Sequence, residues 1–575
     1  MVLNINGMTL SLGERETLLP ARVASLLGLS EGAITELKVV RRSIDARRSR
    51  PPRFVFLLVV RLADGVGWRP GTGQEASGVS VTEMPDIPEE PQGPAGGVST
   101  GSATCKPRLA GGDLGRNQEQ AASLPGSPAL RAGSFNPGPR PVVAGCGPAG
   151  LFAALTLAAK RMPVLLLERG KAVPERLSDV RAFWERGVLN PESHVHFGEG
   201  GAGTFSDGKL TTRIKNPYTA WVKRVLTEMG GPADILTDAR PHIGTDRLRE
   251  VVVNLRRRLT EMGCEIRFGA HVTDFLIRER KLVGIVVNGS EEIRADRLIL
   301  AIGQSASDTY KKLAERGVAL APKPFAMGLR VEHPQEIINR IQYGQWTGHP
   351  DLPPADYTLT AKIEALNRSV YSFCMCPGGQ VIGCSAETGG VITNGMSRFR
   401  RESPFANSAV VVNVRTEDLG GEGPLAGLDF RRHWEERAFV AGGGNYCAPA
   451  QRLMNFLYGR DSLPIGRGSF LPGVRNADLR DLLPHFVVEA LKRGFAEFER
   501  KMPGFITGEA HLIGVETRTS SPVRILRGED GQGVNVAGLF PCGEGAGYAG
   551  GIVSSALDGI RAAERLAMSP GGCPH

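Results

Sequence analysis

Residues 141–170, PVVAGCGPAGLFAALTLAAKRMPVLLLERG, contain the pattern from which the fold follows. An apolar run at 141–144 leads into a glycine-rich turn, Gly145-Cys146-Gly147-Pro148-Ala149-Gly150. A helix-forming segment, LFAALTLAAKR, comes next, and a second apolar run at 163–167 ends in Glu168. This order predicts a strand, a tight turn, a helix and a second strand, which is a βαβ unit with G-x-G-x-x-G in its first turn.

The spacing of the three glycines suits a phosphate-binding turn. Gly145 permits the tight turn, Gly147 lets the backbone approach a pyrophosphate, and Gly150 lets the helix and the strand pack closely. Pro148 and Ala149 begin the helix, where free N–H groups and the positive end of the helix dipole face an anion. The sequence therefore predicts that residues 145–150 bind a dinucleotide.

The second strand of the unit ends in an acidic residue followed by a basic one. Glu168 lies 23 positions after Gly145, where a carboxylate accepts hydrogen bonds from the ribose hydroxyls of the adenosine. We expect Glu168 and its neighbour Arg169 to lie at the cofactor. A carboxylate there would repel the 2′-phosphate of NADP, so FAD and NAD remain as candidates.

Two other segments favour FAD. Residues 264–303 predict a small β-meander with a hairpin at 278–281, followed by an apolar strand that ends at Gly303. Glutathione-reductase-type flavoproteins have such a meander before a strand beside the FAD. The pattern G-x-G-x-x-G recurs at 198–203 and 545–550, but the sequence predicts one Rossmann-type βαβ unit, at 141–168, which fits one tightly held FAD.

The second segment that favours FAD is the C-terminal stretch 536–567, VAGLFPCGEGAGYAGGIVSSALDGIRAAERLA. It predicts a strand, a glycine-rich turn and a helix, and it resembles the second FAD motif of those flavoproteins. Glu544 follows Gly543 and is expected at the ribityl chain or the pyrophosphate, although aspartate is more usual there. The final helix would begin at Gly550, Gly551 and Ile552, with its N-terminus directed at the flavin.

Longer motifs resemble a family of bacterial and plastid FAD-dependent dehydrogenases within the glutathione-reductase-like flavoproteins. They are LNPESHVHFGEGGAGTFSDGKLTTR (189–213), PHIGTDRL (241–248), IGQSASDTY (302–310), PKPFAMGLRVEHPQ (322–335), FCMCPGGQV (373–381), GGVITNGMS (389–397), NYCAPAQ (445–451) and ETRTSSPVRI (516–525). The resemblance covers about 140–570. It implies that the loop 198–208 wraps the flavin through Gly200, Gly201, Gly203 and Thr204. Gln304 departs from the family, which more often has histidine there.

The predicted fold class is α/β, with five regions along the chain. Residues 1–65 form a small βαββ module, and 66–139 are rich in Gly, Pro and Ser and predict a flexible linker. Residues 140–305 and 521–575 form a discontinuous Rossmann-like FAD-binding domain with a β-meander. A mixed α/β substrate domain is inserted at 306–520.

The chain has a formal net charge of +9, from 69 Lys and Arg against 60 Asp and Glu. Arginines 41, 42, 47, 48, 50 and 53 crowd one hairpin of the N-terminal module. This hairpin predicts either a solvated turn or a docking surface for RNA or a protein partner, and the solvated turn is favoured. We expect no secretory signal and no membrane span, and therefore a cytoplasmic protein.

Flavin chemistry needs few protein groups, and the sequence offers several candidates without placing them. Arg518 is preferred, because with Arg524 it would hold a carboxylate or phosphate bidentately. The others are His242, Tyr446, Glu332, His333, Glu516 and Tyr548. For Cys374, Cys376 and Cys384, apolar packing is favoured over a redox dithiol or a metal site, and no metal is predicted.

The predicted function is that of an FAD-dependent oxidoreductase, a dehydrogenase or reductase, that transfers hydride between flavin N5 and a small organic substrate. NAD(P)H is a candidate transient electron donor. Two alternatives remain open at this point. One is a flavin-containing RNA-binding or RNA-modifying protein that docks through the basic module, and the other is a redox-sensing scaffold without turnover.

Overall fold

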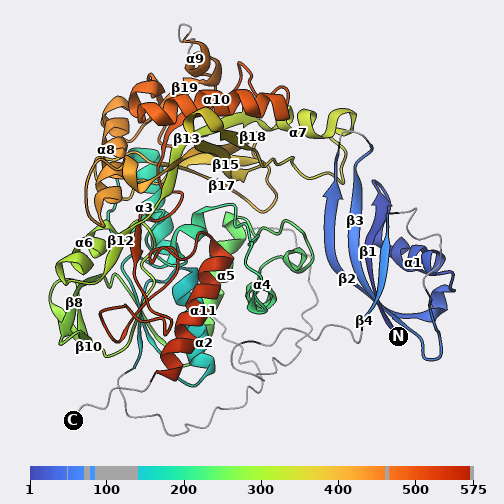
Figure 1. The fold of residues 1–575 in the computed structure, drawn as a ribbon, viewed down its shortest axis with the longest axis horizontal. Coiled ribbons are helices and arrows are strands. Elements are labelled where there is room, and N and C mark those ends of the chain that lie inside the picture. The colour runs from blue at the N-terminus through green and yellow to red at the C-terminus, as the bar shows by residue number, and fades with distance from the viewer. Residues whose placement is uncertain (48–49, 70–77, 85–92, 94–139, 460–464, 570–575) are drawn as a thin grey trace, which may run out of the picture.

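A computed structural model describes residues 1–47, 50–69, 78–84, 93, 140–459 and 465–569 (Figure 1). The chain forms a small N-terminal module, a domain built on a parallel sheet, and a domain built on a larger, mostly antiparallel sheet. Within these described ranges, no helix is both long and apolar enough to cross a membrane.

The N-terminal module is a four-stranded antiparallel sheet in the order β2-β3-β1-β4, with one short helix. Alternate residues of β3, from Phe56 to Leu62, face the apolar residues of β1, and together they pack with α1 into a separate core. The elements are β1 (Val2–Ser11), α1 (Leu19–Leu27), β2 (Ile34–Asp45), β3 (Arg53–Leu62) and β4 (Ser80–Met84). Strand β4 lies in the range predicted as linker, so the module has one more strand than the predicted βαββ. Most of that range, 94–139 included, lies outside the described residues.

Arg42 of β2 joins the module to the parallel-sheet domain. Its backbone N–H donates to the Thr237 carbonyl at 2.8 Å, and its carbonyl accepts from Ala239 N–H at 2.8 Å. Its guanidinium pairs with Asp238 at 2.9 Å. At the predicted docking hairpin, three of the arginines surround a single carboxylate, that of Asp45: Arg47, Arg50 and Arg53. Because these arginines pair within the hairpin, the structure favours the interpretation as a solvated turn. Arg48 lies outside the described residues.

The parallel-sheet domain contains the predicted βαβ unit. Its five strands lie in the order β23-β11-β5-β6-β7, and all are parallel: β23 (Leu539–Pro541), β11 (Leu298–Leu300), β5 (Val142–Ala144), β6 (Leu165–Glu168) and β7 (Glu265–Phe268). Helices cover one face: α2 (Pro148–Ala159), α4 (Tyr218–Glu228), α5 (Thr245–Glu261) and α11 (Ile552–Met568). The β-meander covers the other face: β8 (Val272–Arg278), β9 (Lys281–Val287) and β10 (Glu291–Arg294). Burial on both faces explains the uninterrupted apolar runs of the inner strands β11, β5 and β6, whereas the edge strand β7 alternates polar and apolar residues.

The larger sheet has seven strands in the order β14-β15-β18-β13-β21-β19-β20: β14 (Thr360–Ile363), β15 (Arg368–Cys376), β18 (Phe405–Val414), β13 (Phe325–Pro334), β21 (His511–Glu516), β19 (Ala448–Arg452) and β20 (Val474–Asn476). Around it lie α7 (Gln335–Tyr343), α8 (Ala426–Ala441), α9 (Leu453–Tyr458) and α10 (His485–Lys501), together with the hairpin of β16 (Gly379–Gly383) and β17 (Thr393–Ser397). Helix α10 packs on β14, β15 and β18 at the top of Figure 1.

The boundary between the two large domains differs from the predicted position at residue 306. Helix α6 (Ser307–Glu315) buries Tyr310 and Leu313 against the meander, so it packs with the parallel-sheet domain. Strands β12 (Leu320–Pro322) and β22 (Val523–Ile525) then pair with each other where the chain leaves and re-enters that domain. The seven-stranded sheet begins only at Phe325, and α3 (Val173–Arg186) contributes Phe183 to its core.

Candidate cofactor and active site

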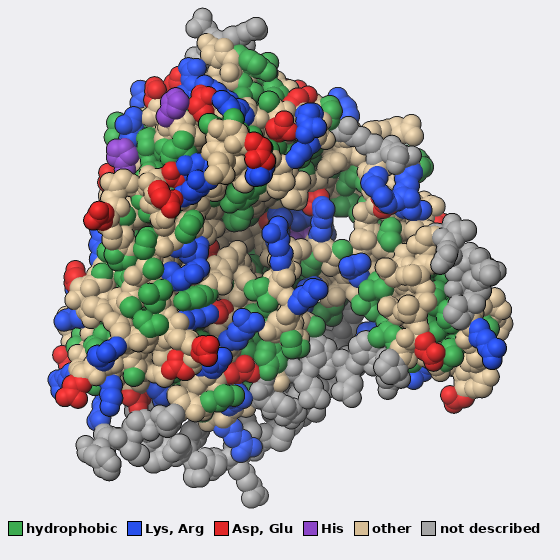
Figure 2. Space-filling model, in the orientation of Figure 1, with side chains coloured by type: hydrophobic (Ala, Val, Ile, Leu, Met, Phe, Trp, Pro, Cys, Tyr) green, Lys and Arg blue, Asp and Glu red, His purple; other side chains and the backbone are tan. Residues whose placement is uncertain are grey.

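A cavity of about 380 Å³ lies where the two large domains meet. One wall comes from the parallel-sheet domain, through the turn after β5, the end of β6, the loop after β11 and the start of α11. The opposite wall includes Phe373, Cys374 and Asn394, which the seven-stranded domain contributes. Figure 2 shows this face of the molecule hollowed between its upper and lower parts.

The G-x-G-x-x-G turn at residues 145–150, here called the glycine fingerprint, lies in this cavity. Its three glycines have different structural roles. A Cβ on Gly145 would lie 2.3 Å from the Ala301 carbonyl oxygen, and one on Gly150 would lie 1.8 Å from the Gly145 oxygen. Both positions therefore need glycine for packing. At Gly147 the nearest protein atom to an added Cβ is 3.9 Å away, so the protein alone leaves room for a side chain. That room belongs to the cavity, which Pro148 and Ala149 also line.

The C-terminal motif meets the fingerprint across the same cavity. Gly543, Glu544, Gly550, Gly551 and Ile552 all line it, as does Gly303 at the end of β11. An added Cβ on Gly550 would have no protein atom within 4 Å. Helix α11 begins at Ile552, so its N-terminus faces the cavity as predicted for an anion-stabilising helix end.

Glu168 lines the cavity and also holds three loops together. Its carboxylate accepts from Cys146 N–H at 2.8 Å, Gly170 N–H at 2.9 Å and Gly198 N–H at 2.8 Å. A carboxylate has about four acceptor positions, so it retains capacity for a hydroxyl group. Beside it, the Arg169 guanidinium lies 4.0 Å from the centre of the Phe197 ring. Ala270, His271 and Val272 close this end of the cavity, and the sequence analysis did not single them out.

The loop 198–208 divides into lining and supporting residues. Gly201 and Gly203 line the cavity. Gly200 and Thr204 instead shape the loop from behind: an added Cβ on Gly200 would lie 2.2 Å from Thr204 Oγ1, which donates to the Glu199 carbonyl at 3.0 Å. The predicted cofactor role of Gly200 and Thr204 is therefore indirect.

A buried arginine that the sequence did not reveal holds this loop in place. Arg176 of α3 is fully buried and donates to four backbone carbonyls, those of His194, Val195, Glu199 and Gly201, at 2.6–2.9 Å. Burial lowers its pKa to about 10. Nothing in the periodicity of α3 separates this arginine from its exposed neighbours, because the partners are backbone atoms.

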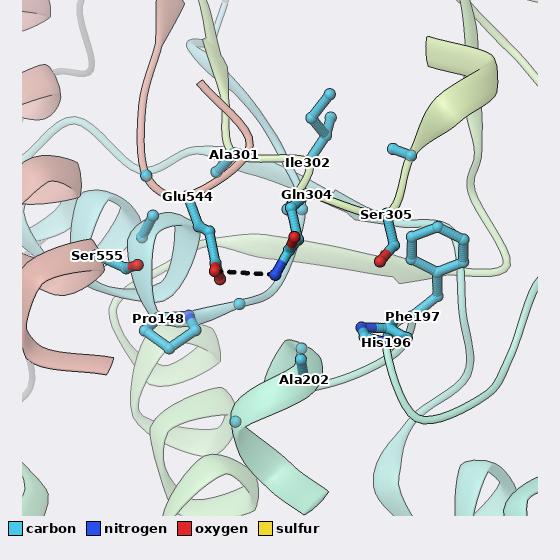
Figure 3. A pocket seen from close by; sticks show the side chains of 18 of the residues that line it. Pro148, His196, Phe197, Ala202, Ala301, Ile302, Gln304, Ser305, Glu544 and Ser555 are labelled. Atoms are coloured by element: carbon cyan, nitrogen blue, oxygen red, sulfur yellow. Dashed lines mark hydrogen bonds between the residues drawn. The ribbon is translucent and has the colours of Figure 1, made fainter. Parts of the chain in front are cut away.

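Gln304 organises the polar groups near the C-terminal motif (Figure 3). Its Nε2 donates to Glu544 Oε1 at 3.0 Å and to the Arg518 carbonyl at 2.7 Å. Its Oε1 accepts from Arg431 Nη1 at 3.3 Å. Burial raises the pKa of Glu544 to about 7. The neutral amide of Gln304 thus links the buried Arg431 guanidinium to the Glu544 carboxyl group in the cavity wall.

Arg518 is the one predicted acid, base or anion-binding candidate that lines the cavity. Its guanidinium pairs with Glu435 at 2.9 Å and Glu387 at 3.1 Å, while Nη1 is buried without a hydrogen-bond partner among the described residues. Arg524 lies over the Tyr548 ring at 5.1 Å and outside the cavity lining. The predicted two-arginine clamp is therefore wrong, because Arg524 points to a different neighbour.

The remaining candidates have structural partners away from the cavity. His242 stacks on Phe399 and its Nε2 lies 3.0 Å from the Phe399 carbonyl oxygen. Tyr446 packs edge-on against Phe183 and Phe439. The others each have a partner elsewhere: Glu516 pairs with Arg330, Glu332 accepts from Ser469, His333 Nε2 lies by the Phe505 carbonyl, and the Tyr548 ring lies under the Arg527 guanidinium.

The wall opposite the fingerprint contains the side chains that the sequence analysis missed. Lys209 pairs with Asp207 at 2.8 Å, and Asp207 also pairs with Arg401 at 2.8 Å. Burial alone would raise the pKa of Asp207, but the two cations outweigh it and lower that pKa. Phe373, Asn394 and Thr519 complete this wall. Asp207 and Lys209 lie in one loop, Phe373 and Asn394 lie in β15 and β17, and Thr519 follows β21. No single sequence spacing connects these three regions, because the tertiary fold brings them together.

Comparison with known proteins identifies the class. Residues 324–519 match the family described as "FAD-dependent protein, C-terminal domain-like", and residues 2–61 match a domain of unknown function, DUF8436. With the glycine cradle described above, this makes the chain a flavoprotein, and FAD is its cofactor.

A full-length relative of the chain comes from Clostridium beijerinckii and is named an uncharacterized protein. It is 41% identical over 568 residues, which cover 98% of each chain. The chain belongs to the same family of FAD-dependent proteins.

Among solved structures, the chain is similar to glycine oxidase from Geobacillus kaustophilus, with 12% identity, coverage of 75% and 95%, and a TM-score of 0.34. It is also similar to a geranylgeranyl bacteriochlorophyll reductase-like protein from Thermoplasma acidophilum, with 14% identity, coverage of 74% and 77%, and a TM-score of 0.32.

Proposed function

We propose that this protein is an FAD-dependent oxidoreductase, a dehydrogenase or reductase, that acts on a small organic substrate. The observation that carries the proposal is the composition of the cavity. One wall is a glycine-lined cradle, and the opposite wall carries the polar side chains of Lys209, Cys374, Asn394 and Thr519. A site that only stored FAD would need no second polar wall.

The parallel-sheet domain would then be the FAD-binding domain. Glu168, Arg169 and residues 270–272 would hold the adenosine, and residues 145–150 the pyrophosphate. Glu544 would bind the ribityl chain, and residues 201–206 with 550–552 would surround the flavin ring. When bound, FAD supplies hydride transfer at its N5 atom.

The seven-stranded domain would be the substrate domain. Asn394, Thr519 and the free Nη1 of Arg518 are hydrogen-bonding groups that orient a substrate in the cavity. Lys209 keeps a positive charge, because Asp207 raises its pKa. Phe373 gives the same wall an apolar surface, which excludes water from one side of the substrate.

An anaerobic titration of the purified yellow protein with NADH and NADPH tests the proposal. Bleaching of the flavin absorbance by one nucleotide would identify a nicotinamide-reduced enzyme, and organic acceptors would then be screened. If neither nucleotide bleaches it, a panel of reduced organic acids, alcohols and amines tests for a dehydrogenase fed by its substrate. Failure of every nucleotide and every substrate would contradict turnover and favour the redox-sensing scaffold.

A further inference from the structure

Two cysteines lie at a bulge of strand β15, in the wall opposite the FAD cradle. Phe373 pairs with Ala409 and Cys376 with Asn407, so Cys374 and Met375 together face the single residue Ser408. Cys374 has a left-handed backbone, with φ of 46°, and its side chain lines the cavity. A bulge of this kind redirects a side chain, and here it directs a thiol into the cofactor cavity.

Cys376 lies directly behind Cys374. It is fully buried, and its Sγ donates to the Cys374 carbonyl at 3.3 Å. That hydrogen bond places the Cys376 sulfur against the backbone of Cys374. The pair therefore consists of one sulfur at the cavity and one protected sulfur close behind it.

Two cations lie beside the pair. Lys209 donates to the Met375 carbonyl, and Arg330 Nη1 donates to the Cys374 carbonyl at 3.3 Å. The neighbouring Cys376 thiol contributes most to a lowered pKa of Cys374; burial opposes this, and Lys209 and Arg330 lower the pKa further. The pKa of Cys376 is raised, first by the Cys374 side chain and then by burial. The arrangement resembles a thiolate with an adjacent thiol, as in dithiol redox centres.

We propose that Cys374 and Cys376 form a redox-active dithiol that exchanges an electron pair with the bound flavin. In the oxidising direction the Cys374 thiolate and the Cys376 thiol form an S–S bond and lose two electrons. Oxidised FAD accepts these electrons with two protons, one from Cys376 and one from solvent, and becomes FADH₂. The reverse step regenerates the dithiol. The proposal needs bound FAD, but not the organic substrate of the proposed function.

The thiol states of the full-length holoprotein test the proposal without an activity assay. Tryptic cleavage after Arg368 and Arg398 leaves Cys374, Cys376 and Cys384 on one peptide. Cys384 is buried away from the pair and serves as the internal reference. After air oxidation, we expect mass spectrometry to find a Cys374–Cys376 disulfide and a free Cys384. After anaerobic dithionite reduction, all three should be free. Free Cys374 and Cys376 in the air-oxidised protein would overturn the proposal.

A reductive titration gives an independent measurement. A dithiol in exchange with FAD should require about twice as much dithionite per flavin as FAD alone, because each centre takes two electrons. Cys376→Ser should halve this requirement, while the control Cys384→Ser should leave it unchanged. An unchanged requirement in Cys376→Ser, measured at equal FAD content, would contradict the proposal. Bleaching by NAD(P)H or a substrate tests the proposed function separately, since it is read from the flavin and not from the thiols.

Discussion

The two walls of the cofactor cavity are built in contrasting ways. The proposed FAD cradle uses backbone atoms of residues that are neighbours in sequence, such as those of residues 145–150. The opposite wall uses side chains that come from distant positions, such as Lys209, Cys374 and Thr519. A local backbone site leaves a spacing that can be read in the sequence, whereas a wall assembled by sheet topology leaves none. Four substitutions test this difference.

The largest effect is expected from Gly147→Val in the cradle. The protein leaves room for the new side chain, but the side chain would occupy the place of the pyrophosphate. We expect FAD affinity to fall by more than about a thousandfold, or about 4.1 kcal/mol, with the fold retained. The flavin absorbance per protein after gel filtration measures this. Gly508→Val, at another glycine with open space around its Cα, is the matched control and should keep its FAD. Full flavin content in Gly147→Val would contradict the assignment of residues 145–150 to FAD binding.

The second effect concerns the support of the cradle. Arg176→Met keeps much of the side-chain volume but leaves four backbone carbonyls without their donor. Unsatisfied buried polar groups cost about 1–3 kcal/mol each, so we expect a loss of roughly 3 kcal/mol or more in unfolding free energy. Denaturant unfolding of the flavin-free protein checks the prediction. Arg181→Met, at an exposed position of the same helix, should be nearly neutral. Equal stability of the two variants would argue against the supporting role.

The third substitution moves to the opposite wall. Lys209→Met removes a cation while Asp207 keeps its pair with Arg401. FAD content should stay close to that of the wild type, because the side chain belongs to the substrate side of the cavity. The rate of flavin reduction by the substrate or NAD(P)H should fall about tenfold, which corresponds to about 1.4 kcal/mol. Stopped-flow absorbance measures this rate. Loss of FAD with an unchanged rate would assign Lys209 to the cradle instead.

The smallest effect is a pH dependence that originates at Glu544. Burial raises its pKa from the ordinary 4.5 to about 7, so the folded protein holds this proton more tightly than the unfolded chain. Its stabilising effect is complete below about pH 4.5 and is lost as the pH rises through about 7. Relative to Glu544→Gln, the flavin-free wild type should lose roughly 1–2 kcal/mol between about pH 5 and pH 8. Parallel unfolding curves of the two proteins over this range would contradict the shifted pKa.

Much of the parallel-sheet domain could be predicted because its signals are local. The βαβ unit, the meander and the C-terminal helix each follow from short-range periodicity and glycine spacing. Strand β4 was missed because SVTEM lies in a segment whose composition indicates a linker, and only pairing with β1 makes it a strand. Arg518 was found through its motif, but its supposed partner Arg524 was not, since side-chain direction depends on tertiary contacts.

The Arg176 hydrogen bonds have a further consequence for how the protein acquires its flavin. Because the loop 194–201 is held by a side chain of the protein itself, its conformation does not depend on the cofactor. The entropy of ordering this loop is therefore lost during folding and not during FAD binding. We expect flavin-free chains to fold fully and to fill rapidly when FAD becomes available. The supply of FAD, and not a slow rearrangement of the polypeptide, would then set the pace of holoprotein formation.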